Sequence, residues 1–359
     1  MKHFLLICDG MAEEPLEVLG GRTPQQAADT PNMDLLAARG TTGFLQNCPP
    51  DFPPGSDTAI LTILGYDSAK IYTGRAALEA ADLGIPLASG ETAFRGNLVG
   101  LLDGKIHSHC GADGENALHC TKKLVQDPVF AEILEQSGCS MTPLPSFRQL
   151  LITPGFSGRT HAPHDHLGKP LESILPENNC LRALTLRSVE VLKADDLALC
   201  FWGPGSAMVL PPFPRKGTLI SATAVCRGIG LLAGLEVPRV PGATGGTDTD
   251  YGAKASAVLS AFGRGIDFVA AHVEAPDTCA HLRDPLQKTE AISRIDKLLL
   301  GPVLAELEKG SEPYRVLILS DHETSCRTGR HTAASVPYVC FDSQGIIPEG
   351  STAMDILFG

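Results

Sequence analysis

The chain contains three apolar segments that each run into an acidic side chain. They are HFLLICD at 3–9, DFVAAHVEAPD at 267–277 and YRVLILSDH at 314–322. Continuous apolar runs of this length are typical of strands buried on both faces of a parallel sheet. Segments with helical signals lie between them. The pattern therefore predicts an α/β fold built on a doubly wound, mostly parallel sheet.

Several helices can be placed from their end signals. Thr23-Pro24 and Thr30-Pro31 each put a capping residue before a proline at the first helical position, and the second helix, PNMDLLAAR, stops at Gly40. A longer helix is predicted over about 285–308, where apolar residues recur on one face.

The acidic side chains at the ends of these predicted strands should lie close together. Ligands bind outside the carboxyl ends of the strands in such sheets. Asp9, Asp277 and Asp321, together with His322, should therefore meet at one edge of the sheet. A single aspartate after a strand is commonly a turn former or helix cap, but three with a histidine favour a functional site.

These side chains belong to a pattern that suits a metal. Asp277 and His281 are four residues apart, so they share one face if the segment is a helical turn. His331 follows Asp321-His322 in DHETSCRTGRH. Carboxylates and imidazoles without thiolates suit Mn²⁺ or Mg²⁺, with Zn²⁺ as an alternative. Taken alone, His281 is equally well explained as a capping or surface histidine.

Ser56 in PPGSDTAI, at 53–60, precedes an apolar run that starts like a helix. A serine at this position is usually an N-cap. Near metal ions the same hydroxyl can act as a nucleophile, because a cation lowers its pKa and a helix N-terminus favours phosphate oxygens. Both interpretations of Ser56 stay open at this point.

The middle of the chain, about 81–214, has more proline and glycine breaks and shorter apolar runs than the rest. The segments that end in candidate ligands lie on both sides of it. We therefore predict one domain made of 1–80 and 215–359, with 81–214 inserted as a second domain.

Composition excludes several classes of function. The net charge is −12 and basic runs are absent, which argues against nucleic-acid binding. Apolar runs fall short of the ~20 residues that span a bilayer, and the N-terminus lacks the features of a signal peptide. The eleven cysteines form no C-x-x-C pair, so we expect reduced thiols and a cytoplasmic protein.

Six segments in order resemble one family: CDGMAEEPLEVLGGRTPQQAADTPNMDLLAARG, PGSDTAILTILGYD, IYTGRAALEAADLGI, GIGLLAGLEVPRVPGATGGTDTDY, HVEAPDTCAH and SDHETSCRTGRHT. Together they resemble the cofactor-independent phosphoglycerate mutases of the archaeal type, in the alkaline phosphatase superfamily. The resemblance implies an alkaline-phosphatase-like fold with an inserted α/β domain that binds substrate. It also implies two metal ions, commonly manganese, held by two sets of ligands: Asp9, Ser56, Asp321 and His322 for the first, and Asp277, His281 and His331 for the second.

The implied activity is that of an isomerase of glycolysis. The phosphoryl group of a small phosphorylated metabolite, 3-phosphoglycerate, passes to Ser56 and returns to the other hydroxyl to give 2-phosphoglycerate. A bacterial branch proposed to act as homoserine kinases is the alternative within the family. A metal-dependent phosphatase and a catalytically silent metal-binding protein are further alternatives.

The sequence departs from the archaeal pattern where substrate should be held. The segment GKIHSHCGADG carries His107 and His109 in place of clustered arginines, and SFRQLLITPG carries only Arg148. A His-rich version of this loop resembles the homoserine-kinase branch. Arg75 and Arg95 match family arginines near the junction of the domains, where either could contact phosphate or connect the two domains. We expect these five residues to bind substrate, with a solvated loop as the alternative for His107 and His109.

Overall fold

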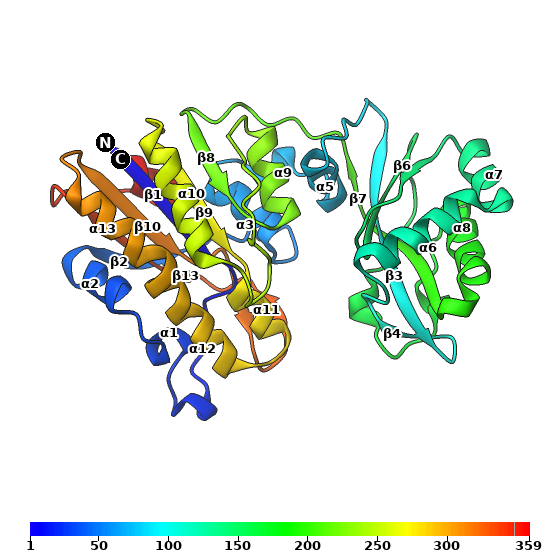
Figure 1. Ribbon diagram of the computed structural model, residues 1–359, viewed down its shortest axis with the longest axis horizontal. Helices are drawn as coiled ribbons and strands as arrows, with labels where there is room; N and C mark the ends of the chain where they lie inside the picture. The colour runs from blue at the N-terminus through cyan, green and yellow to red at the C-terminus, as the bar shows by residue number, and fades with distance from the viewer. Residues whose placement is uncertain (348) are drawn as a thin grey trace. The chain divides into compact units, whose positions relative to one another are not determined.

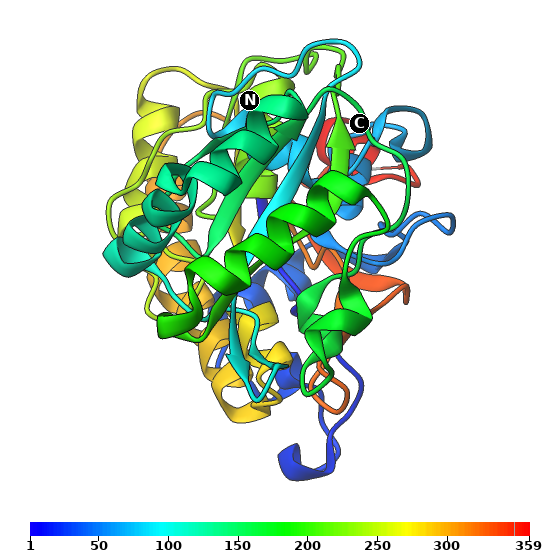
Figure 2. The same ribbon diagram turned by 90° about the vertical axis from the view of Figure 1, so that its right-hand side faces the viewer.

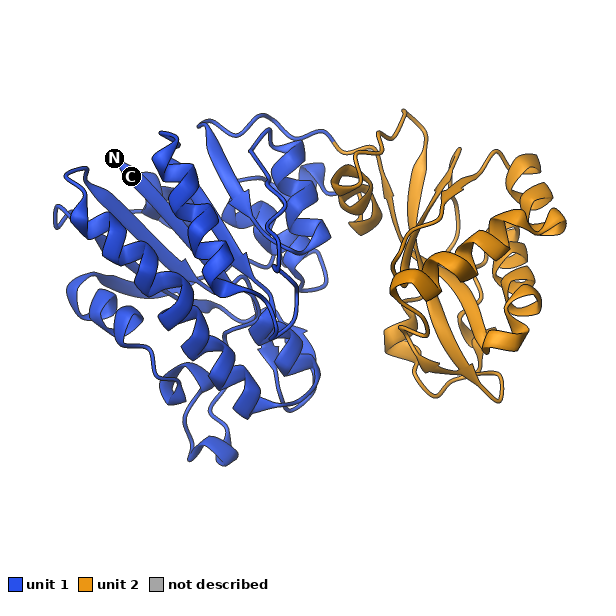
Figure 3. Ribbon diagram, in the orientation of Figure 1, with its two compact units in different colours: residues 1–72, 209–359 blue, residues 73–208 orange. Residues whose placement is uncertain are grey.

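The computed structural model describes residues 1–347 and 349–359. The chain divides into two compact units, shown in two colours in Figure 3. Unit 1 comprises Met1–Tyr72 and Val209–Gly359, and unit 2 comprises Thr73–Met208. Both limits of unit 2 thus lie several residues before the 81 and 214 expected from composition. The first difference arises because helix α5, Arg75–Asp82, packs against strands of unit 2.

Unit 1 contains a six-stranded sheet in the order β2-β13-β10-β1-β9-β8. Its strands are β1 (Lys2–Cys8), β2 (Thr41–Leu45), β8 (Gly217–Ile220), β9 (Phe268–Val273), β10 (Tyr314–Leu319) and β13 (Val336–Asp342). Neighbouring strands from β10 to β8 pair in parallel, while β13 is antiparallel to both β10 and β2. All the strands except β13 therefore run in one direction, which confirms the predicted mostly parallel sheet.

Helices cover both faces of this sheet. They are α1 (Pro24–Ala27), α2 (Pro31–Arg39), α3 (Ser56–Ile63), α4 (Ser68–Ile71), α9 (Ala224–Leu232), α10 (Tyr251–Gly263), α11 (Ala275–His281), α12 (Pro285–Arg294), α13 (Gly301–Lys309) and α14 (Ala353–Phe358), with a short 3₁₀ turn η1 (Glu17–Leu19). Ile220 on β8 joins the core beneath α10 and α13, the face turned to the viewer in Figure 1. The preceding Leu219 contacts Gly230 of α9 on the other face. The alternation of side chains along β8 thus gives the doubly wound arrangement.

The helix predicted over 285–308 contains a break. A π-helical segment, η5 (Ile295–Leu300), separates α12 from α13. Pro302 follows the π segment, and proline has no N–H for the regular helical hydrogen bond. The five apolar residues predicted to share one face are all buried, as expected: Ile292, Ile295, Leu299, Val303 and Leu307.

The N-terminus of α2 is capped from a distant part of the chain. Thr23 caps α1 as predicted, but the Thr30 side chain makes no capping hydrogen bond. The carboxylate of Asp296 accepts from the backbone N–H of Met33 at 2.7 Å and of Asn32 at 3.2 Å instead. Thr30 thus occupies the predicted N-cap position, but its side chain does not satisfy the helix donors, because a buried carboxylate from the π segment does so.

Unit 2 is built on a five-stranded sheet whose strand pairs are all antiparallel. Its strands are β3 (Thr92–Leu102), β4 (Lys105–Ser108), β5 (Ser140–Thr142), β6 (Arg148–Thr153) and β7 (Leu197–Ser206). Its longer helices are α5, α6 (Gly114–Gln126), α7 (Pro128–Gln136) and α8 (Asn179–Val191), and its 3₁₀ turns are η2 (Pro163–His166), η3 (Leu171–Ile174) and η4 (Lys193–Asp195). Figure 2 shows α8, in green, lying in front of the strands. The helical residues Leu181 and Leu184 pack there against Phe94 and Phe201 of the sheet. Within the described ranges, no helix is both long and apolar enough to cross a membrane.

Candidate functional site

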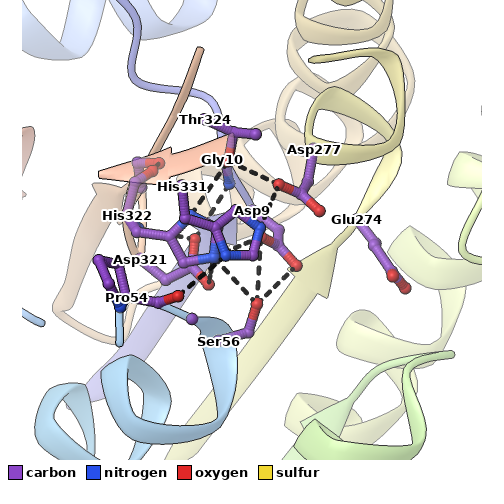
Figure 4. A network of polar contacts seen from close by, with 12 residues as sticks. Asp9, Gly10, Pro54, Ser56, Glu274, Asp277, Asp321, His322, Thr324 and His331 are labelled. Atoms are coloured by element: carbon purple, nitrogen blue, oxygen red, sulfur yellow. Dashed lines mark hydrogen bonds and ion pairs between the residues drawn. The ribbon is translucent and has the colours of Figure 1, made fainter. Parts of the chain in front are cut away.

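The acidic residues at the strand ends come together at one edge of the unit 1 sheet (Figure 4). Asp9 directly follows β1, and Asp321 follows β10 after one intervening residue. Asp277 lies on α11, which begins just beyond β9. The backbone N–H of Gly10 donates to Asp321 Oδ1 at 3.0 Å, so the ends of β1 and β10 are tied together. Parallel strand direction thus gathers residues that are more than 300 positions apart.

Gly10 lets these groups approach closely. Its φ is +59°, a conformation that favours glycine. A Cβ at this position would lie 2.6 Å from Asp277 Oδ1 and 2.6 Å from Thr324 Oγ1. Any side chain here would push the ligand groups apart, which explains why glycine follows Asp9.

Ser56 is the first residue of α3, and its side chain points into the cluster (Figure 4). The N-cap position belongs to Gly55, which has no side chain for capping. The hydroxyl Oγ lies 3.1 Å from His322 Nε2 and 3.3 Å from Asp9 Oδ2. The capping interpretation of Ser56 is therefore wrong. Its hydroxyl instead contacts an imidazole and a carboxylate.

A second group of potential ligands surrounds Asp277. Its Oδ2 lies 3.1 Å from His281 Nε2, and its Oδ1 lies 3.4 Å from His331 Nε2. The helical turn of α11 places Asp277 and His281 on one face, as their spacing predicted. Backbone carbonyls contact the other nitrogen of each ring, Gly329 O at 2.9 Å for His281 and Pro54 O at 3.0 Å for His331. Such contacts orient imidazoles that bind metals.

A short two-stranded ribbon carries part of this group. In the pairing of β11 (Glu323–Ser325) with β12 (Arg330–Thr332), Thr324 lies opposite His331. The Thr324 hydroxyl donates to Asp277 Oδ1 at 2.6 Å and lies 3.1 Å from His322 Nδ1. Sequence reasoning missed Thr324. Its place two residues after His322 in DHET was the only signal of its role.

His272 is a second residue that sequence reasoning missed. It is fully buried on β9, with Nε2 at 3.0 Å from Asp9 Oδ2 and Nδ1 at 3.2 Å from Ser221 Oγ. The signal was its position inside the apolar run VAAHV, because an imidazole buried on a strand needs polar partners. His272 thus supports Asp9 from the neighbouring strand β9.

The half of the site around Asp9 is an unfavourable environment for an ionised carboxylate. Burial, reinforced by the nearby charge of Asp321, raises the pKa of Asp9 well above its usual value. Burial also lowers the pKa of His322, and it lowers that of His272 to about 4. These imidazoles therefore remain neutral at pH 7 and are available as ligands.

The half around Asp277 is balanced by its own histidines. Burial opposes ionisation of Asp277, but hydrogen bonds from His281 and His331 keep its pKa well below the usual value. Burial likewise opposes protonation of both histidines, yet their contacts with Asp277 raise the pKa of each. The two halves of the site therefore differ in charge balance.

The donor set fits divalent cations. Among the described residues, three groups of side chains have potential ligand atoms within 4.8 Å of one another: Asp277, His281 and His331; Asp9, Asp277 and His322; and Asp9, His272 and Asp321. Asp321 Oδ2 is buried, and among the described residues it has no hydrogen-bond partner, although His322 Nε2 lies 3.4 Å away. A buried carboxylate oxygen without a donor is an acceptor that a cation would satisfy.

The five residues expected to bind substrate all lie in unit 2. Arg95 on β3 is buried, forms an ion pair with Glu79 at 3.1 Å and lies over the Trp202 ring at 4.9 Å. Arg75 begins α5 and lies 3.6 Å from the same carboxylate. Arg95 and Arg75 thus share one acidic partner, Glu79.

Two more of these residues meet at another aromatic side chain. Arg148, at the start of β6, lies 5.0 Å from the centre of the Phe147 ring, and the His109 ring lies 6.1 Å from it. His107 is exposed on β4. Unit 2 therefore brings His109 near Arg148, and Arg75 near Arg95.

Comparisons with known proteins agree with this geometry. The family model described as 2,3-bisphosphoglycerate-independent phosphoglycerate mutase matches residues 37–197. A protein of that name from Methanothrix thermoacetophila is 37% identical over 98% of this chain and 95% of its own length. A Geobacter sulfurreducens protein, named as a probable mutase of the same kind, is 36% identical over 96% of this chain and 91% of its own.

This chain belongs to that family.

Solved structures support the fold of this mutase-family chain. The PH0037 protein from Pyrococcus horikoshii matches with a TM-score of 0.76 at 26% identity, over 95% of this chain and 88% of its own. The cofactor-independent phosphoglycerate mutase from Thermoplasma acidophilum matches with a TM-score of 0.56 at 22% identity, over 98% of this chain and 92% of its own. The relatives at 36–37% identity confirm the family resemblance seen in the sequence motifs, and the solved structures agree with the fold.

Proposed function

We propose that this member of the mutase family interconverts 3-phosphoglycerate and 2-phosphoglycerate through a phosphoserine at Ser56. The observation that carries the proposal is the position of the Ser56 hydroxyl. It lies at the start of a helix and within 3.1–3.4 Å of His322 and Asp9. A hydroxyl without a capping role, held among potential metal ligands, is suited to accept a phosphoryl group.

Two divalent cations, Mn²⁺ by preference and Mg²⁺ or Zn²⁺ as alternatives, complete this proposal. Asp9, Ser56, Asp321 and His322 would hold the first, and Asp277, His281 and His331 the second. Bound cations lower the pKa of the hydroxyl and stabilise the attacking and leaving oxygens of an in-line transfer. The buried Asp321 Oδ2 and the paired histidines around Asp277 support this division.

The protein groups themselves orient the nucleophile. Asp9 contacts Oγ through both carboxylate oxygens, so it can accept a hydrogen bond from the Ser56 hydroxyl with one oxygen while the other is free to hold a cation. His272 and Gly10 N–H hold the carboxylates of Asp9 and Asp321 in place. The α3 N-terminus, where Ser56 begins the helix, favours the negative charge of a phosphoryl group.

Unit 2 supplies the substrate contacts in this proposal. Arginines recognise carboxylate and phosphate groups through paired hydrogen bonds. Arg75, Arg95, Arg148, His107 and His109 would recognise the glycerate carboxylate and phosphate. The contacts of Arg95 with Glu79 and Trp202 would fix the orientation of its guanidinium group. The reaction is a step of glycolysis, and we propose that the protein acts in the cytoplasm.

A direct test measures three reactions side by side with purified protein and Mn²⁺. Enolase-coupled formation of 2-phosphoglycerate from 3-phosphoglycerate is expected without added bisphosphoglycerate or ATP, and EDTA should abolish it. Phosphorylation of homoserine by ATP and release of inorganic phosphate from 3-phosphoglycerate are the comparisons. A protein that phosphorylates homoserine, or that only releases phosphate, does not have the proposed function.

A further inference from the structure

Two cysteines of unit 2 have their thiols in contact. Cys139 lies in the turn between α7 and β5, and Cys180 lies in the first turn of α8. They are 41 residues apart in the chain, and their Sγ atoms lie 3.7 Å apart. Both are partly exposed. The pair thus combines proximity with access from solvent.

Backbone hydrogen bonds fix both cysteines in place. The Cys139 N–H donates to Leu134 O at 2.8 Å, which closes the turn after α7. The Cys180 N–H donates to Asn178 Oδ1 at 3.0 Å, in the cap of α8. Both side chains pack against the hydrophobic core of unit 2. The contact between the sulfurs is therefore maintained by the surrounding fold.

Cys180 differs electrostatically from the other ten cysteines. Cys180 lies in the first turn of α8, where the helix N-terminus favours a thiolate, and its contact with Cys139 lowers its pKa further. Burial is the main cause of a raised pKa at each of the remaining nine: Cys8, Cys48, Cys110, Cys120, Cys200, Cys226, Cys279, Cys326 and Cys340. A partly exposed thiolate beside a second thiol is the usual arrangement of a redox-active cysteine pair.

We propose that Cys139 and Cys180 form a reversible dithiol–disulfide pair that reacts with small disulfides of the glutathione class. The Cys180 thiolate attacks one sulfur of the small disulfide, forms a mixed disulfide and releases one small thiolate. Cys139 then loses its proton and attacks the Cys180 sulfur, which releases the second small thiolate. The protein pair is oxidised by two electrons, and the small disulfide is reduced to two thiols.

The bond would require only a local adjustment. The sulfurs must close from 3.7 Å to about 2.0 Å, the length of a disulfide. The disulfide would join the turn before β5 to the start of α8, so it would restrain local opening of unit 2. In a reducing compartment the pair rests as thiols and responds when small disulfides accumulate.

The test uses the full-length protein with EDTA present, so that thiols are not occupied by metal. Four proteins are incubated with oxidised glutathione under native conditions: wild type, Cys139→Ser, Cys180→Ser and the matched control Cys110→Ser. Cys110 is the remaining partly exposed cysteine. Peptide mass spectrometry then identifies disulfides and glutathione adducts, and circular dichroism verifies that each variant is folded.

Wild type and Cys110→Ser should form a Cys139–Cys180 disulfide without retained glutathione, and dithiothreitol should reverse it. Cys139→Ser should accumulate a glutathione adduct at Cys180, because the resolving thiol is missing. Cys180→Ser should react at Cys139 at least tenfold more slowly. Wild-type protein that stays reduced, or that forms disulfides at other cysteines in preference to this pair, would overturn the proposal. So would a Cys180 that is modified no faster than Cys110.

Discussion

Replacing Ser56 with alanine separates catalysis from stability. The hydroxyl contributes no cap to α3, since Gly55 occupies the N-cap position. Its contacts with Asp9 and His322 measure 3.1–3.4 Å, the long end of the hydrogen-bond range. Asp9 keeps His272 as a partner at 3.0 Å in the variant. We therefore expect Ser56→Ala to change the free energy of unfolding by less than about 1 kcal/mol.

The effect on turnover should be far larger. Removing a nucleophile typically costs several orders of magnitude in rate, so we expect at least about a thousandfold loss of mutase activity, equivalent to about 4 kcal/mol of activation free energy. The enolase-coupled assay measures the rate, and thermal unfolding with Mn²⁺ measures stability. Wild-type protein quenched during turnover should also carry phosphate on the peptide that contains Ser56, and the variant should not.

Ser68 provides a matched control. It is also a buried serine at the first position of a helix, α4, and its hydroxyl donates to Thr58 O at 3.1 Å. Ser68→Ala should lower the unfolding free energy by about 1 kcal/mol and leave turnover within a few fold of wild type. If Ser56→Ala turns over 3-phosphoglycerate at a near-normal rate, the reasoning about Ser56 as the nucleophile is refuted.

Three further predictions concern the site and its supports. A double variant, His281→Ala with His331→Ala, should lose about half of the bound metal measured by atomic emission, and unchanged metal content would contradict the assigned ligands. His272→Ala removes the support of Asp9 and should weaken Mn²⁺ binding about 10–100-fold in a calorimetric titration; wild-type affinity would show that His272 has no such role. Burial lowers the pKa of His3 from 6.5 to about 4. Between pH 6.5 and pH 4, His3 is therefore protonated in the unfolded chain but neutral in the folded protein. The unfolding free energy should fall by about 3 kcal/mol as the pH falls through that window. In urea titrations, the unfolding free energy of His3→Gln should not show this loss between pH 6.5 and pH 4. If the variant and wild type lose stability in parallel as the pH falls, His3 is not the cause.

Features that depend on local pattern and strand direction could be predicted from the sequence. Asp9 and Asp321 follow apolar runs, and parallel pairing of β1 with β10 brings such positions to the same edge. The spacing of Asp277 and His281 identified a shared helix face because one helical turn separates them. These inferences needed only local patterns and the common strand direction of a parallel sheet, without the individual side-chain contacts.

Features that depend on contacts between distant segments could not be predicted. Asp296 caps α2 from 264 positions away, and nothing near Thr30 indicates this. His272 contacts Asp9 across 263 positions. Thr324 reaches Asp277 only because the β11–β12 ribbon folds over α11. Each contact depends on tertiary packing, which local propensity does not encode.

The charge distribution of the site explains why the two halves should depend differently on metal. Hydrogen bonds from His281 and His331 favour the ionised form of Asp277 and hold its pKa below the usual value. Asp9 and Asp321 are both almost fully buried and lie among imidazoles whose pKa burial lowers. Burying carboxylates without a counter-charge costs several kcal/mol. The burial of Asp9 and Asp321 at one sheet edge therefore lowers the stability of the fold, and a bound cation would offset this loss. A local arrangement that costs stability is expected at a functional site.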